Sequence, residues 1–125
     1  MDKSRIESFR AKLLKEKKRL EEELAKMHEE NMKTTFARED YGGDENYEDH
    51  MADAATNIFD RERDLSLEQN VKDLTIQVDE AIHRLDDGRY GQCTNCGKRI
   101  DEARLRAIPY ADLCIDCKKD EERLR

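Results

Sequence analysis

Apolar residues recur every seven positions near the start of the chain, and most residues between them are Lys, Arg or Glu. Such a repeat places the apolar side chains in one narrow stripe along an α-helix, and pairing with a second helix in a coiled-coil-like manner buries that stripe. The pattern predicts a helix of about 25 residues. Its stripe comprises Ile6, Phe9, Leu13, Leu20, Leu24 and Met27.

A second stripe follows a polar interruption. Residues 33–50 contain Gly42, Gly43 and many acidic residues, which predict a loop. Heptad-like spacing then resumes with one skip between Leu65 and Leu67, and Gly88 predicts the end of this second helix. The second stripe comprises Met51, Ile58, Leu65, Leu67, Val71, Leu74, Val78, Ala81 or Ile82, and Leu85.

Two helices that each carry one stripe, joined by one polar loop, bury both stripes by folding back on each other. We therefore predict an all-α fold, with a long antiparallel coiled-coil hairpin over residues 1–87 and its tip loop at about residues 33–50. Residues 88–125 would form a small C-terminal module with a short C-terminal helix. Because the hairpin covers its own stripe, we expect a monomer.

Composition and charge narrow the class of protein. The chain of 125 residues is 36% hydrophobic and 44% charged, with too few apolar residues for a large compact core. No stretch approaches the roughly 20 apolar residues of a membrane span, and no signal peptide is evident, so we expect a cytoplasmic protein. The formal net charge of −7 disfavours non-specific binding to nucleic acid and favours basic partners.

Four cysteines stand in two C-x2-C pairs, namely Cys93, Cys96, Cys114 and Cys117. Because cytosolic thiols stay reduced, this spacing favours metal over disulfides. Four thiolates complete a tetrahedron and leave no open position, so we predict one structural zinc ion. Its binding, worth roughly 10–16 kcal/mol in small zinc peptides, would supply most of the folding free energy of this module.

Two other interpretations of the cysteines concern redox chemistry. A thiol–disulfide redox pair typically occurs as a single C-x2-C within a βαβ pattern, which is missing from this sequence. A zinc site that releases its metal on oxidation remains an alternative.

Other functional classes find little support in the sequence. Residues 93–125 contain eight basic and seven acidic residues, so we expect no direct sequence-specific binding of nucleic acid. The three histidines have no spacing that links them to each other or to the cysteines. No nucleophile–base arrangement or phosphate-binding loop is evident, and we predict no catalytic residues and no enzymatic activity.

The predicted loop and the start of the second helix are strongly acidic. Residues 39–68 contain eleven acidic residues and two arginines. Most of these acids are typical of a solvated loop and of a helix start. The segment DHMADAA, residues 49–55, differs because Asp49 and Asp53 share one helix face among small alanines. This arrangement indicates a probe for a confined site that is basic or contains a metal.

The segment GRYGQCTNCGKRI…RLRAIPYADLCIDCKK, residues 88–119, resembles the zinc-finger signature of the DksA/TraR family of bacterial transcription regulators. The resemblance, to its short sporulation-associated members in particular, implies insertion of the hairpin tip through the secondary channel of RNA polymerase to modulate initiation. It places Asp53 and Ala55 on a D-x-x-D-x-A tip motif. His50 occupies the first Asp position, and Asp49 is the candidate substitute.

The resemblance also bears on the alarmone guanosine tetraphosphate. In the best-known members, an Arg and two Lys contribute to sensing it at the polymerase interface. The matching residues here are Asn70, Gln77 and Lys118, of which only Lys118 is basic. The remaining alternative from a different class is a coiled-coil adaptor or structural protein that does not act on RNA polymerase.

Overall fold

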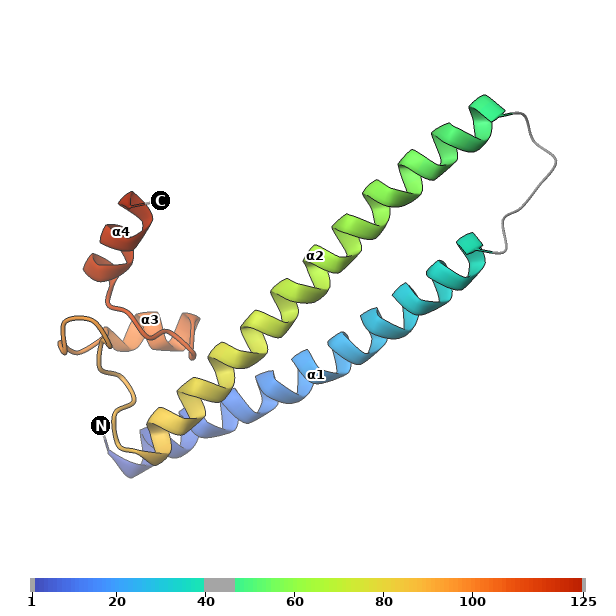
Figure 1. Cartoon of the computed structure of the whole chain (residues 1–125). Coiled ribbons are helices and arrows are strands. Elements are labelled where there is room, and N and C mark those ends of the chain that lie inside the picture. Colours follow the sequence, from blue (N-terminus) through green and yellow to red (C-terminus); the bar gives the residue numbers. More distant parts are fainter. Residues whose placement is uncertain (1, 40–46, 125) are drawn as a thin grey trace. The chain divides into compact units, whose positions relative to one another are not determined.

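The computed structural model describes residues 2–39 and 47–124, and their side chains except at positions 34–39 and 47–54. Four α-helices follow one another along the described chain (Figure 1): α1 (Lys3–Glu39), α2 (Tyr47–Asp86), α3 (Glu102–Ala107) and α4 (Ile115–Arg123). The described part contains no β-strand, and its one isolated antiparallel bridge joins Gln92 to Arg99. These elements confirm the predicted class, an antiparallel helical hairpin followed by a small four-cysteine module.

Both long helices reach into the range 33–50 that we predicted as a loop. Helix α1 ends at Glu39, and α2 begins at Tyr47. Polar residues alone do not end a helix, because charged side chains four positions apart support it, as Lys33 and Glu29 do at 3.1 Å. No helix of the described part is both long and apolar enough to cross a membrane.

The chain falls into two compact units. One comprises Met1–Arg19 with Leu74–Arg125, and the other comprises Leu20–Asp73. The predicted division into residues 1–87 and 88–125 followed the motif rather than spatial contact, and it stays a prediction.

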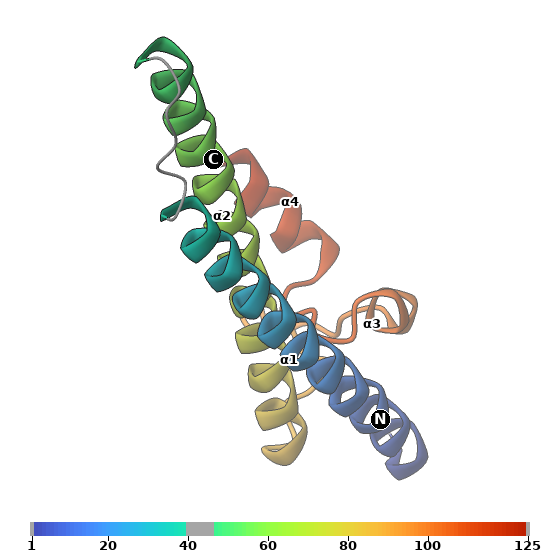
Figure 2. The same cartoon turned by 90° about the vertical axis from the view of Figure 1, so that its right-hand side faces the viewer.

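The first unit has an apolar core shared by α1, α2 and the cysteine module. Its part of α1 runs antiparallel to α2 (Figures 1 and 2), since Arg10 pairs with Asp86 at 2.7 Å and Lys17 with Asp79 at 2.9 Å. The Phe9 ring contacts the ring of Tyr90, with centroids 5.4 Å apart. The buried apolar side chains of this unit are Phe9, Leu13, Val78, Ala81, Leu85, Tyr90, Ile100, Leu105 and Ala111.

The second unit has a more polar interior. Leu20 is buried on α1, and on α2 both Val71 and the carboxylate residue Glu68 are buried. Nδ1 of His28 lies 3.0 Å from Oε1 of Glu68, which gives the buried carboxylate a partner on the opposite helix. The half-buried positions between residues 55 and 66 are likewise polar: Asn57, Asp60 and Asp64.

The predicted inward stripe is wrong for three residues of this unit. Ile58, Leu65 and Leu67 are 59%, 52% and 47% exposed. Heptad steps back from buried Val71 reach Asp64 and Asn57, so Ile58 and Leu65, one position later, are rotated by about 100° away from α1. Met51, also assigned to the stripe, has its side chain outside the described residues.

Candidate metal centre

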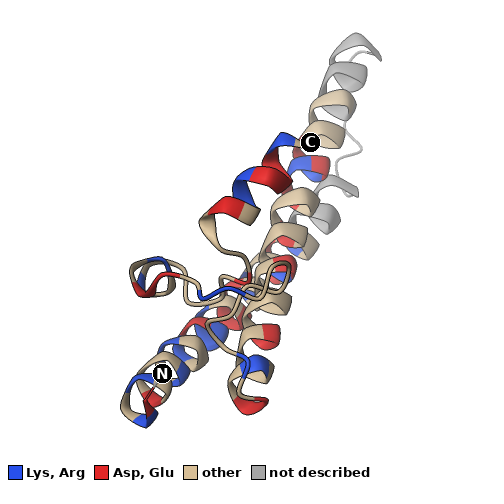
Figure 3. Ribbon diagram, turned by 90° about the vertical axis from the view of Figure 1, so that its left-hand side faces the viewer, with Lys and Arg blue, Asp and Glu red and all other residues tan. Residues whose placement is uncertain are grey.

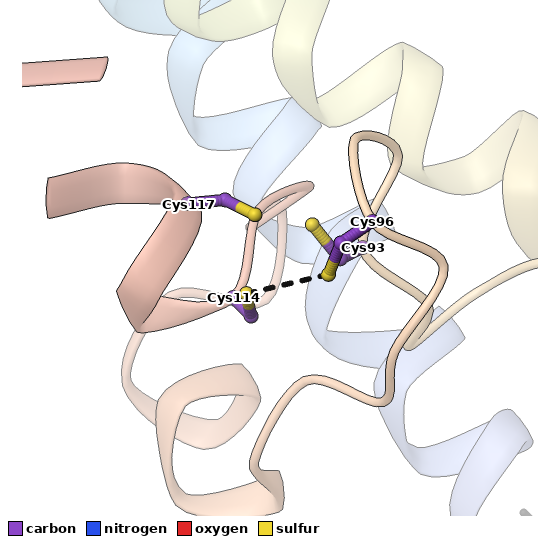
Figure 4. Close-up of side chains that lie close together, drawn as sticks. All are labelled: Cys93, Cys96, Cys114 and Cys117. Atoms are coloured by element: carbon purple, nitrogen blue, oxygen red, sulfur yellow. Dashed lines mark hydrogen bonds between the residues drawn. The ribbon is translucent and has the colours of Figure 1, made fainter. Parts of the chain in front are cut away.

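The structure brings the four predicted cysteine ligands together. Cys93 and Cys96 come from the loop after α2, whereas Cys114 precedes α4 and Cys117 lies in its first turn (Figure 4). All four sulfur atoms lie within 4.8 Å of one another. The cysteines are free, so no disulfide closes the cluster.

The sulfur positions fit a zinc ion. Sγ of Cys96 lies 3.7 Å from Sγ of Cys114. In a tetrahedron with Zn–S bonds of about 2.3 Å, neighbouring sulfurs are about 3.8 Å apart. A donor set of four thiolates suits Zn²⁺ and leaves it a structural role.

Local backbone geometry forms the first knuckle. Gly97 has a φ of 78°, in the left-handed region that favours glycine. This turn lets the Gly97 N–H donate to the Cys93 carbonyl at 3.0 Å and the Cys93 N–H donate to the Lys98 carbonyl at 2.8 Å. The C-x2-C-G sequence therefore curls around the point where its two sulfurs converge.

The second knuckle is the start of a helix. Cys114 precedes α4, and its carbonyl accepts from the N–H of Lys118 at 2.9 Å. The two knuckles are joined through the main chain, because the N–H of Thr94 donates to the carbonyl of Asp112 at 2.8 Å. This bond holds the loop of the first pair against the segment that leads into the second.

The electrostatics of the cluster favour a bound cation. Burial raises the pKa of Cys93, but N–H groups of Cys96, Cys114 and Asn95 outweigh it and lower this pKa to about 6. For Cys117, the Asn95 amide lowers the pKa, whereas the neighbouring thiols and desolvation raise it to about 12. Crowded sulfurs thus resist full ionisation by themselves, and a divalent cation removes that obstacle.

Asn95 is a site residue that sequence reasoning missed. Its Nδ2 donates to Sγ of Cys117 at 3.4 Å. The C-x2-C pattern leaves its two inner positions open, so the only available signal was the presence of an amide between two ligands.

The charges of the module are mixed. Lys and Arg alternate with Asp and Glu along α4 (Figure 3), where Lys118 pairs with Glu121 at 3.9 Å and Arg123 with Asp120 at 3.6 Å. The expected lack of direct nucleic-acid binding stays a prediction.

The predicted tip residues fall at the start of α2. The side chains of Asp49, His50 and Asp53 lie outside the described residues, and Ala55 is exposed. Of the three positions compared for alarmone sensing, Asn70 and Gln77 are exposed on α2 and Lys118 is half-buried. The roles of the tip residues stay predictions.

Comparison with known proteins shows which family and which solved structures the chain is similar to. The family model described as the prokaryotic dksA/traR C4-type zinc finger matches residues 88–123. The solved structure of transcription factor DksA2 from Pseudomonas aeruginosa is 31% identical with a TM-score of 0.79, over 98% of this chain and 87% of that one. The solved structure of an RNA polymerase-binding regulator from Chlamydia trachomatis is 20% identical, with a TM-score of 0.58. The match covers 98% of this chain and 93% of that one, and it supports the fold alone.

Curated relatives agree with the structural match. General stress protein 16O of Bacillus subtilis is 35% identical over 75 residues, which are 60% of this chain and 46% of the relative. The RNA polymerase-binding transcription factor DksA of Escherichia coli K12 is 38% identical over 79 residues, 55% of this chain and 52% of the relative. The chain thus spans about half the length of the curated relatives that it matches.

Fold and site together define a helical-hairpin protein with a C4-type zinc finger. The chain belongs to the DksA/TraR family, since the match to DksA2 extends over nearly its whole length and the family model covers the finger. The resemblance inferred from the cysteine segment is confirmed.

Proposed function

We propose that this protein is a transcription regulator that binds bacterial RNA polymerase through its secondary channel and modulates initiation. The observation that carries the proposal is the similarity to transcription factor DksA2, which extends through hairpin and finger alike. The curated relative of E. coli that matches this chain is named as an RNA polymerase-binding transcription factor. We further propose that the protein acts in the cytoplasm, as a monomer.

The tip residues Asp49, Asp53 and Ala55 would act near the polymerase active site. Two features of α2 support this assignment. Ala55 is exposed, and Phe59, one turn further on, is 74% exposed, so the described start of α2 offers an apolar contact surface. The helix begins in an acidic segment, which suits the basic or metal-containing surroundings of a nucleotide-polymerising centre.

Cys93, Cys96, Cys114 and Cys117 would hold one zinc ion. When bound, it supplies a structural crosslink between the two knuckles and no open coordination position. The chain's own contribution is to converge four sulfurs through the Gly97 turn and the start of α4.

Two measurements test the proposal: the binding of the zinc-loaded protein to RNA polymerase core enzyme, and then its effect on the lifetime of open promoter complexes. We expect binding that a channel-blocking competitor abolishes. Asp53→Asn should bind with an affinity within about threefold of the native protein but lose most of the effect on lifetime, because the charge acts after docking. Asp73→Asn, an exposed substitution of the same kind on the same helix, should behave like the native protein.

Two results would count against this function. Failure to bind polymerase at micromolar concentration would contradict RNA polymerase as the partner. Full activity of Asp53→Asn would contradict the role assigned to the tip residues. Either result would leave the fold and the metal site standing.

A coiled-coil adaptor is the second candidate function. The exposed heptad pair Ile58 and Leu65 favours it, because two apolar side chains seven residues apart on a helix suit a partner helix. Sedimentation separates the candidates: a stable elongated dimer that persists on dilution supports the adaptor, and a monomer supports the polymerase regulator.

A further inference from the structure

Asn95 links the two cysteine pairs through its side chain. It belongs to the first knuckle, between Cys93 and Cys96, and its Nδ2 donates to Sγ of Cys117 in the second knuckle at 3.4 Å. The bond therefore spans 22 positions of sequence and ends on a sulfur of the four-cysteine cluster. Asn95 itself is not among the four residues that converge on the metal position.

Hydrogen bonds hold the main chain on either side of Asn95. Its neighbour Thr94 donates twice to the carbonyl of Asp112, from the N–H at 2.8 Å and from Oγ1 at 3.2 Å. On its other side, the N–H of Gly97 bonds to the Cys93 carbonyl at 3.0 Å. These bonds fix the main chain on both sides of Asn95, so only its side-chain torsions remain to be ordered when its amide contacts Cys117.

The partner sulfur sits on a helix that packing does not anchor. Helix α4 has no buried residue, and Cys117 is half-buried, whereas Cys93 on the other side of the cluster is only 3% exposed. Burial therefore protects the Cys93 sulfur, whereas Cys96 is exposed and Cys114 and Cys117 are half-buried. At the half-buried Cys117, the Asn95 amide is a protein group that directly contacts the sulfur.

We propose that Asn95 is a positioning residue of the metal site, whose N–H···S hydrogen bond stabilises Cys117 as a zinc-bound thiolate and slows release of the metal. Four thiolates on Zn²⁺ carry a net charge of −2, and an amide donor offsets part of that charge without competing for the metal. The bond also holds the first turn of α4 against the first knuckle. This inference rests on the proposed zinc site and is independent of RNA polymerase.

The first test measures zinc release from the full-length, zinc-loaded protein to an excess of a chromogenic chelator. Asn95→Ala should release zinc at least about tenfold faster, the effect typical of removing an outer contact to a ligand. Asn95→Asp should release it faster still, because a carboxylate adds negative charge beside the thiolates and removes the donor. Thr94→Ala is the matched control, since it loosens the same loop without touching a sulfur.

The second test uses the cobalt-substituted protein and separates a bond to sulfur from mere loop stability. Loss of a hydrogen bond raises the energy of the sulfur lone pairs, so the thiolate-to-cobalt charge-transfer band of Asn95→Ala should move to longer wavelength. The ligand-field bands should keep their tetrahedral pattern. In Thr94→Ala, neither set of bands should move.

The outcomes are distinguishable. Equal zinc release from Asn95→Ala and the native protein, with an unmoved charge-transfer band, would overturn the proposal. So would faster release shared equally by Thr94→Ala, because that result assigns Asn95 a general structural role. Failure of the native protein to take up zinc or cobalt would instead contradict the metal site itself.

Discussion

Tyr90 shows how single side chains join the cysteine module to the helices. Its ring lies against Phe9 of α1, and its hydroxyl donates to the carbonyl of Pro109 at 2.8 Å. Burial raises the pKa of this phenol to about 12, although the positive charge of Arg84 partly lowers it. The folded state therefore favours the neutral phenol.

Stability should fall in alkaline solution because of Tyr90. Its pKa is raised from 10.0 to about 12 on folding, so the folded protein holds this proton more tightly than the unfolded chain. The resulting stabilisation is fully present below pH 10 and is lost as the pH rises towards 12. Urea unfolding of the native protein and of Tyr90→Phe over this pH range measures the difference.

The free energy of unfolding of Tyr90→Phe should be about 1 kcal/mol lower at neutral pH, because the hydrogen bond to Pro109 is lost. It should also decline less steeply above pH 10. The same alkaline slope in both proteins would show that Tyr90 is not the titrating group.

At the scale of the helix, burial follows the face that meets the partner helix rather than hydrophobicity. Glu68 is buried with His28 as its partner, whereas Leu65, on the same helix, is half exposed. A buried carboxylate requires a hydrogen-bonding partner, and this pair favours the register in which His28 and Glu68 meet. Polar contacts of this kind specify register more sharply than leucines do.

The adjacent pair Leu13 and Leu14 tests the assignment of the buried face of α1. Leu13 is fully buried and Leu14 is 50% exposed. Leu13→Ala should lower the free energy of unfolding by about 2–5 kcal/mol, because it removes buried methyl groups and leaves a cavity. Leu14→Ala should change it by less than about 0.5 kcal/mol. Chemical denaturation of both variants measures these changes, and similar losses would mean that the face is wrongly assigned.

At the scale of the whole molecule, the two compact units differ in what stabilises them. The unit that contains the cysteines combines an apolar core with the candidate metal site. In the unit Leu20–Asp73, the described side chains include few buried apolar residues, and polar pairs such as His28 and Glu68 join its helices. Helices α3 and α4 are short, at 6 and 9 residues, and α4 has no buried residue. We therefore expect them to depend on a bound metal more than α1 and α2 do.

Removal of zinc should therefore act locally. Chelation should unfold the region of α3 and α4 but keep most of the helical signal, because α1 and α2 comprise 37 and 40 residues. Far-ultraviolet circular dichroism measures the helix content, and amide hydrogen exchange locates the loss. Complete loss of helix on chelation would show that the hairpin also depends on the metal, and re-addition of zinc controls for irreversible damage.

The sequence by itself predicted the four cysteines that the structure brings together and most of the buried stripe. Both are local patterns: C-x2-C spacing predicts a chelating turn, and the heptads through Leu13 and through Val71 to Leu85 predict helix faces that the structure does bury. The family followed from the same segment. The ends of the helices were less predictable, because charged residues at 33–39 continue a helix as readily as they form a loop.

Only the tertiary structure decided which way α2 faces before Val71 and what contacts the metal ligands. The buried Glu68 contacts His28, forty residues away, and the contact of Asn95 with Cys117 spans 22 residues. Neither contact leaves a periodic signal in the chain. The pairing register of α1 and α2 selects the face that α2 turns towards α1. Contacts between distant residues fix that register, and the order of apolar residues in either helix does not.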